Sequence, residues 1–132
     1  MPNLGWFKIA LTLILLTLLS AAGTAETLRF AAMGDLPYRS SERLNMPRWL
    51  TEISATQPAF ILHVGDFKGS REECSDANFM GRYHLFNAAS RPFIYTPGDN
   101  EWSDCDQRLA GGFDPVERLN KLRQIFFFAT NR

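Results

Sequence analysis

Three apolar segments in this chain end in the same pair of residues, a glycine followed by an aspartate. The segments read FAAMGD at 30–35, FILHVGD at 60–66 and FIYTPGD at 93–99. A single Gly-Asp pair is more typical of an ordinary turn, because both residue types are common in turns. Three such pairs, each placed after an apolar run, indicate three strands that each end in a carboxylate.

Helical patterns lie between and after these strands, at 46–57, near 75–89 and from 114 onward. Strand and helix therefore alternate three times, which predicts an α/β fold with a parallel sheet and right-handed crossovers. The segment before 46 is expected to be a polar loop. Asn45 and Asp114 are the expected helix caps, Pro47 and Pro115 are the expected first-turn residues, and Glu117 is expected to close a capping box. The last helix is expected to bury Val116, Leu119, Leu122 and Phe126.

In parallel sheets, ligands bind outside the carboxyl ends of the strands, which is where the three aspartates are expected. Neighbouring strands lie about 4.8 Å apart, so Asp35, Asp66 and Asp99 would repel one another and raise their own pKa values. A stable protein needs a positive charge to offset them, and a divalent metal suits carboxylate oxygens well. The basic candidates, which could also hold a substrate phosphate, are Arg39, Lys68 and Arg71.

A pair of divalent metals held by carboxylates has a known chemical use. A bridging carboxylate suits two metals, and the pair lowers the pKa of a bridging water and clamps both oxygens of a displacement at phosphorus. The glycine before each aspartate would let the backbone pass close to the ions. The sequence therefore predicts a metal-dependent hydrolase of phosphate esters.

The motifs GDLPY at 34–38, GDFK at 65–68 and GDNE at 98–101 resemble those in the first half of the calcineurin-like metallophosphoesterases. The stretches HVGDFK and YTPGDNEWSDC are especially similar to an exported bacterial branch, and the resemblance covers 28–127. It implies a four-layer α/β/β/α sandwich, of which this chain would hold mainly one parallel sheet with flanking helices. It also implies two divalent metal ions (Mn, Fe, Zn or Mg) and a phosphate monoester or diester as substrate.

The resemblance assigns roles to residues by position. Asp35 matches a ligand of the first metal, and Asp66 matches the aspartate that bridges both metals. Asp99 stands where the family has an asparagine ligand of the second metal. Asn100 stands where the family has a histidine that stabilises or protonates the leaving group, although an amide has no proton to release near neutral pH. Glu101 matches the acidic residue that closes the motif.

The main departures from the family concern histidine. Pro37 replaces the histidine of the first motif, and Tyr38 is the neighbour that would substitute for it by position. The later histidine motifs have no counterpart, since the chain contains only His63 and His84. His63 is expected to be a core residue or a partner of a metal ligand. We therefore expect 26–132 to be the N-terminal portion of a metallophosphoesterase domain, truncated and inactive or weakly active by itself.

The first 25 residues have the layout of a secretory signal peptide. Lys8 precedes the apolar stretch IALTLILLTLLS at 9–20, and small residues follow up to Ala25. A retained membrane anchor is the alternative, but the stretch is short for a span of roughly 20 apolar residues. We therefore expect an exported protein, periplasmic or secreted, with no stable membrane span after cleavage. The chain has a formal net charge of zero and no run of like charges, which gives no nucleic-acid-binding patch.

Two cysteines, Cys74 and Cys105, follow the second and third Gly-Asp pairs. An even number of cysteines in an exported chain predicts a disulfide. Two free thiols are the alternative, which requires that the chain is not exported. Zinc ligation is disfavoured because the chain has no Cys-x-x-Cys pair.

Two other classes of protein stay open from the sequence. One is a non-catalytic exported domain, or an inactive remnant of the phosphoesterase family, whose aspartates bind a structural ion such as calcium or nothing. The other is the phospho-acceptor receiver fold, which also gathers acidic residues at strand ends. Export argues against the receiver fold, because its chemistry uses cytosolic phosphodonors. An unfinished sheet edge is also expected to make the chain prone to self-association.

Overall fold

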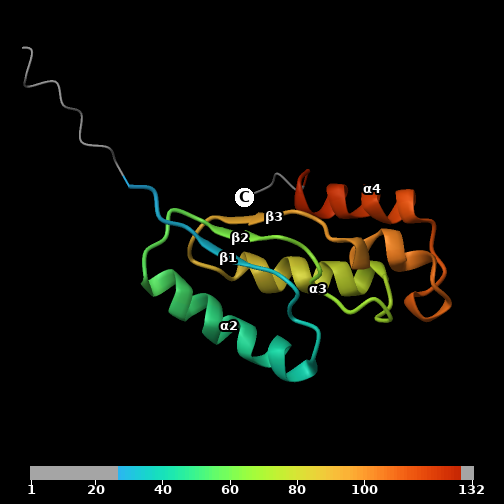
Figure 1. The fold of residues 1–132 in the computed structure, drawn as a ribbon, viewed down its shortest axis with the longest axis horizontal. Coiled ribbons are helices and arrows are strands. Elements are labelled where there is room, and N and C mark those ends of the chain that lie inside the picture. Colours follow the sequence, from blue (N-terminus) through green and yellow to red (C-terminus); the bar gives the residue numbers. More distant parts are fainter. Residues whose placement is uncertain (1–26, 129–132) are drawn as a thin grey trace, which may run out of the picture.

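The structure, a computed structural model, describes residues 27–128 and is organised around a small parallel sheet (Figure 1). The strands are β1 (Ala31–Met33), β2 (Ile61–His63) and β3 (Phe93–Tyr95), in the order β1-β2-β3. Each strand precedes a Gly-Asp pair and is apolar except for His63 of β2, and the predicted α/β fold with a parallel sheet is confirmed. The predicted signal peptide, residues 1–25, lies outside the described residues. No helix within the described part of the chain is long and apolar enough to cross a membrane.

The three strands are paired in register, but their carboxyl ends are staggered. Met33 lies opposite His63, and His63 lies opposite Tyr95. In β1 the glycine of the Gly-Asp pair is the next residue after this aligned position. In β2 one residue separates the aligned position from the glycine, and in β3 two residues do. The three pairs therefore form a staggered row at one edge of the sheet.

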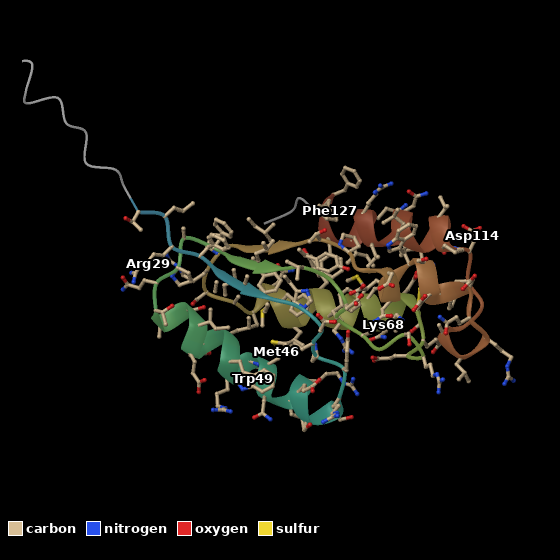
Figure 2. The ribbon with its side chains drawn as sticks, viewed as in Figure 1. Arg29, Met46, Trp49, Lys68, Asp114 and Phe127 are labelled. Atoms are coloured by element: carbon tan, nitrogen blue, oxygen red, sulfur yellow. A yellow bond between two sulfur atoms is a disulfide. The ribbon has the colours of Figure 1, made fainter. Side chains whose placement is uncertain are left out.

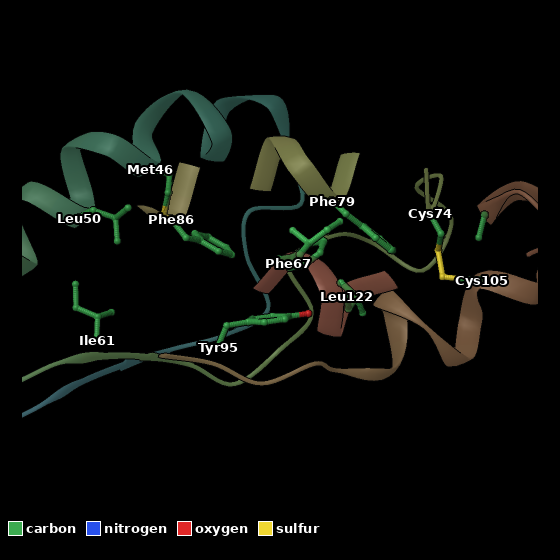
Figure 3. Packing of buried hydrophobic residues seen from close by; sticks show 12 residues of the cluster. Met46, Leu50, Ile61, Phe67, Cys74, Phe79, Phe86, Tyr95, Cys105 and Leu122 are labelled. Carbon is green, nitrogen blue, oxygen red and sulfur yellow. A yellow bond between two sulfur atoms is a disulfide. The ribbon is translucent and has the colours of Figure 1, made fainter. Parts of the chain in front are cut away.

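Helices α2 (Ser40–Ala55), α3 (Asp76–Asn87) and α4 (Pro115–Phe126) supply the other side of the core. Their buried apolar side chains pack against the inward side chains of the strands in one cluster (Figure 3). Burial of this apolar surface is the main driving force for folding. The aromatic pairs that join helices to β3 are Phe86–Phe93 and Phe126–Tyr95, with ring centroids 4.7 and 4.4 Å apart.

The opposite face of the sheet is apolar and open among the described residues. Val64 and Ile94 are 54% and 47% exposed. Phe30 is 53% exposed and stacks on Phe60, with ring centroids 5.0 Å apart. Residues 27–128 therefore form a two-layer unit, and the second sheet that the resemblance implies is not among them.

Helix α2 begins at Ser40, so the prediction of a polar loop up to Asn45 is wrong. The physical reason is Glu42, whose carboxylate accepts hydrogen bonds from the backbone N–H groups of residues 38 and 39 at 2.6 and 2.9 Å. These bonds satisfy donors at the helix start that would otherwise lack partners. Pro47 consequently lies inside the helix and not in its first turn.

The other two helices begin where the sequence predicts, but α4 is buried differently. Asp114 accepts a hydrogen bond from the Glu117 N–H at 2.8 Å, which confirms the predicted cap. The Glu117 carboxylate pairs with Arg118 instead of completing a capping box. Val116 is 61% exposed, so its predicted burial is wrong, whereas Arg118 is buried. The Arg118 guanidinium donates to the Cys74 carbonyl at 2.8 Å, which satisfies a charged group in the interior.

The predicted disulfide between Cys74 and Cys105 is present, with the two Cα atoms 5.8 Å apart (Figure 3). After β3 the chain forms three short 3₁₀ helices, η1 (Asp99–Glu101), η2 (Ser103–Asp106) and η3 (Arg108–Ala110). The bridge connects η2 to the loop that follows β2. It therefore ties together the segments that follow the second and third Gly-Asp pairs.

Replacing both cysteines with serine should lower the free energy of unfolding by about 3–4 kcal/mol, because the bridge joins residues 31 positions apart in the chain. Urea denaturation of the oxidised wild type and of the Cys74→Ser/Cys105→Ser variant measures the difference. Intact mass with and without reductant confirms that the wild type carries the bond. A loss below about 1 kcal/mol would contradict this role, because native disulfides typically contribute more.

Candidate functional site

Hydrogen bonds from backbone N–H groups hold the Gly-Asp pairs together at the carboxyl edge of the sheet. The Asp35 N–H donates to the Gly65 carbonyl at 3.1 Å, which joins the ends of β1 and β2. The Asn100 N–H donates to the Asp66 carboxylate at 3.2 Å, which joins the end of β2 to η1. The structure thus brings Asp35, Asp66 and Asp99 to one edge, here called the acidic edge.

Asp66 follows the middle strand, and its carboxyl group interacts electrostatically with both other aspartates. Burial raises the pKa of its carboxyl, and the negative charges of Asp99 and Asp35 raise it further. The hydrogen bond from the Asn100 N–H opposes this shift. A raised pKa is the expected result of acidic groups that lack a neutralising partner. The acidic edge therefore favours a cation or a proton beside Asp66.

Two glycines are required because the strand ends approach each other closely. A Cβ atom on Gly98 would lie 2.1 Å from Asp66 Oδ1, and one on Gly65 would lie 2.3 Å from the Gly98 nitrogen. Gly65 also has a φ of +99°, in the left-handed region that favours glycine. In the absence of side chains, the backbone of the segment after β3 packs directly against Asp66.

Asp35 and Asp66 both have left-handed backbone conformations, with φ of 57° and 59°. Residues other than glycine are uncommon in this region, although aspartate is one of those enriched there. Each such residue costs on the order of 1–3 kcal/mol where the conformation is strained, and such residues cluster at functional sites. Two of the three such residues within 27–128 lie at adjacent strand ends, which makes the acidic edge the candidate functional site.

Tyr38 joins the acidic edge from the loop after β1. Its hydroxyl donates a hydrogen bond to Asp35 Oδ1 at 3.0 Å. Burial raises the pKa of Tyr38, and the hydrogen bond to Asp35 and the charge of Asp66 act in the same direction, while the Asn100 side chain opposes them. Tyr38 therefore contributes a neutral hydroxyl to the site, where it acts as a hydrogen-bond donor to Asp35.

Glu101 is fully buried behind the acidic edge. One of its carboxylate oxygens accepts a hydrogen bond from the Phe67 N–H, and the other accepts one from the Gly98 N–H at 3.1 Å. Burial raises the pKa of Glu101 to about 7. Because both oxygens are engaged by backbone groups, Glu101 links the segment after β2 to the segment after β3.

Lys68 is buried as well, and its ammonium group is engaged within its own loop. The Nζ atom donates to the carbonyls of Glu72 at 2.8 Å and Gly69 at 3.2 Å, and burial lowers the pKa of Lys68. Arg82 of α3 contacts the same loop, donating to the Phe67 carbonyl at 3.0 Å and to the Glu72 carboxylate at 2.9 Å. These two cations therefore stabilise the loop that follows Asp66.

Neither histidine belongs to the acidic edge. His63 is fully buried, and its ring packs on Phe86 with centroids 4.9 Å apart. Its Nδ1 accepts a hydrogen bond from the Gly65 N–H at 3.1 Å, so Nε2 carries the proton and donates to the Leu36 carbonyl at 2.7 Å. Burial lowers the pKa of His63. His63 is thus a core residue with backbone partners, while His84 is exposed on α3.

The residues at the acidic edge fit a metal only in part. The carboxylates of Asp35, Asp66 and Asp99 and the Tyr38 hydroxyl are oxygen ligands of the kind that Mg²⁺ and Mn²⁺ prefer. Within residues 27–128, however, no group of three or more His, Cys, Asp or Glu side chains is arranged to hold a metal ion. The described residues therefore do not fit, by themselves, the dinuclear centre that the resemblance implies.

Comparison with known proteins adds no assignment. No protein-family model matches the chain, and no curated protein and no solved structure matches it. The resemblance carried by the three Gly-Asp motifs therefore stays a prediction.

The sequence pattern singled out the aspartates together with Tyr38, Lys68 and Glu101, but it did not show that Lys68 and Glu101 are buried and bonded to backbone groups. One signal was available: Gly98 and Glu101 have the spacing of a capping box, and Glu101 does bind the Gly98 N–H. The burial of Lys68 has no comparable signal, because lysine is almost never fully buried. The stabilisation of the site by buried charged residues is therefore visible in the structure and not in the sequence.

Changing Gly98 to alanine should lower the free energy of unfolding by about 1–3 kcal/mol. The new Cβ atom would meet Asp66 Oδ1 at 2.1 Å and the Asp66 nitrogen at 2.7 Å. Gly69→Ala is the matched control, since nothing lies within 4 Å of its added Cβ. Urea denaturation of the two variants measures the effect, and equal stabilities would contradict the close approach at the acidic edge.

The free energy of unfolding should fall as the pH is lowered, because His63 is buried in its neutral state. Its pKa is lowered from 6.5 in the folded protein, so below pH 6.5 the unfolded chain binds more protons. The contribution of the neutral ring is therefore fully present above pH 6.5 and is lost as the pH falls toward the lowered pKa. His63→Gln should remove this part of the pH dependence, and the exposed-residue control His84→Gln should retain it. Urea denaturation between about pH 5 and pH 7.5 is the measurement; the same slope in both variants would contradict it.

Proposed function

We propose that residues 27–128 form the acidic part of a metal-dependent phosphoesterase of the calcineurin-like type, an exported hydrolase of phosphate monoesters or diesters. The observation that carries this proposal is the environment of Asp66. Its strand lies between those of the other two aspartates, burial and the charges of those aspartates raise its pKa, and glycine backbone packs against its carboxylate. A carboxylate in that position is suited to bind cations on either side.

The proposal assigns the hydrolytic chemistry to two divalent ions whose remaining ligands come from outside residues 27–128. Asp35, Asp66 and Asp99 would provide carboxylate oxygens. The Asn100 amide would donate a hydrogen bond to an oxygen of the phosphate ester but would release no proton. Tyr38 would orient the Asp35 carboxylate through its hydrogen bond.

Export is supported by the disulfide between Cys74 and Cys105, because such bonds persist in oxidising compartments. The same argument disfavours the receiver fold, whose chemistry depends on cytosolic phosphodonors. The periplasm or the exterior of the cell is therefore the proposed location.

A non-catalytic metal-binding domain is the second candidate, and the ligand set favours it. Within residues 27–128, both ring nitrogens of His63 are bonded to backbone groups and His84 is exposed on α3, so the acidic edge offers oxygen ligands and no histidine ligands. In this alternative the aspartates would bind a structural ion such as calcium. The two candidates agree on cation binding and differ in hydrolysis.

Cation binding is tested first, by Mn²⁺ electron paramagnetic resonance on the full chain. Asp66→Asn should weaken Mn²⁺ binding by roughly tenfold or more, because it removes a charged ligand at the centre of the site. Asp106→Asn, at an exposed residue of η2, is the matched control and should leave binding unchanged. Equal binding by both variants would contradict both candidates.

Hydrolysis is then measured with a phosphodiester and a phosphomonoester in the presence of Mn²⁺. We expect weak Mn²⁺-dependent turnover that is lost in Asp66→Asn, because the described residues lack the further ligands of a dinuclear centre. Mn²⁺ binding with no turnover would support the non-catalytic candidate. If turnover is fast in the wild type and is lost in Asp66→Asn, the expectation that the site is incomplete is wrong, but the phosphoesterase proposal is supported.

A further inference from the structure

The amino end of the sheet, opposite the acidic edge, carries an open pocket of about 360 Å³. Figure 2 shows Arg29 at this end of the molecule, well separated from Lys68 near the acidic edge. Two arginines, Arg29 and Arg91, line the pocket, and none of its lining residues is acidic. The complete lining is Thr27, Leu28, Arg29, Gln57, Ala59 and Arg91.

Arg91 is held in place on the wall of this pocket. It is half-buried, and its Nε–H donates to the Pro58 carbonyl at 2.6 Å. A guanidinium group has five N–H donors, so the terminal nitrogens keep donors for a ligand. Among the described residues Arg91 has no acidic partner, in contrast to Arg82 and Arg118, which pair with Glu72 and Asp76.

The rest of the pocket is built on ordered backbone. The Arg29 carbonyl accepts a hydrogen bond from the Ala59 N–H at 2.8 Å, which fixes the two chain segments side by side. Gln57 has a left-handed φ of 54°, and its N–H donates to the Ser54 carbonyl at 3.0 Å at the end of α2. The backbone positions of the arginines are therefore set before any ligand binds, which lowers the entropic cost of binding.

We propose that this pocket binds a small oxyanion, either the phosphate or the carboxylate group of a compact ligand. Guanidinium groups match the geometry of both anions, and two of them without an acidic partner leave an excess of positive charge. The pocket volume lies at the lower end of the range for small-molecule sites. The pocket is independent of the proposed hydrolytic function, because its residues all lie at the opposite end of the sheet.

The test is a titration of the full chain with inorganic phosphate and, separately, with citrate, followed by amide chemical shifts. EDTA is present and the ionic strength is held constant, so that metal at the acidic edge and general screening do not contribute. Saturable shifts at Arg29, Gln57 and Ala59 are expected, and the tighter of the two anions identifies the ligand class. No saturable shift with either anion would overturn the proposal.

Three variants make the test specific. Arg29→Ala and Arg91→Ala should each weaken anion binding by roughly tenfold or more, because each removes charge-assisted hydrogen bonds. Arg48→Ala is the matched control, since Arg48 is exposed on α2 and pairs with Glu52. Arg29 is exposed and has no ion pair among the described residues, so its variant should fold even if Arg91→Ala does not. Equal anion binding by Arg29→Ala and Arg48→Ala would overturn the proposal.

Discussion

The close approach of the chain at Gly98 to the end of β2 is the constraint on which the acidic edge depends. Asp66 can follow the middle strand only if the neighbouring backbone carries no side chain, because a Cβ on Gly98 would overlap its carboxylate. That approach places the Asn100 N–H on Asp66 and the Gly98 N–H on Glu101. The glycines therefore act on the geometry of the aspartates themselves, which is a more local role than making room for bound ions.

Charged groups behind this edge are buried in unusual number for a small domain. Glu101, Lys68 and Arg82 are all buried, and each is paired with backbone groups of the segments around Asp66. Burying a charge without such partners would be strongly unfavourable. These residues therefore use their hydrogen-bonding groups to hold the backbone in place. The aspartates, Tyr38 and Asn100 remain as the groups able to face a ligand.

The sequence pattern predicted the features that depend on residues close together in the chain. The strands, the Asp114 cap and the disulfide follow from apolar runs, turn chemistry and cysteine count, and the gathering of the aspartates follows from parallel topology. The start of α2 was missed because a carboxylate at Glu42 outweighs the apolar pattern in defining the first turn. Arg118 was missed because an arginine becomes an interior residue only when the Cys74 carbonyl and Asp76 are there to receive it.

The stabilising contacts are distributed unevenly between the acidic edge and the faces of the sheet. A domain of this size buries a modest fraction of its surface, so fastenings such as disulfides matter more than in a large protein. Here the disulfide and Arg118 act on the loops at the acidic edge, whereas one face of the sheet stays open within the described residues. Parallel sheets are usually covered on both faces, and covering the exposed Val64 and Ile94 would add hydrophobic stability. Stability is thus concentrated where it fixes the aspartates, which is expected if their relative positions, and not the completeness of the core, are what the fold has to preserve.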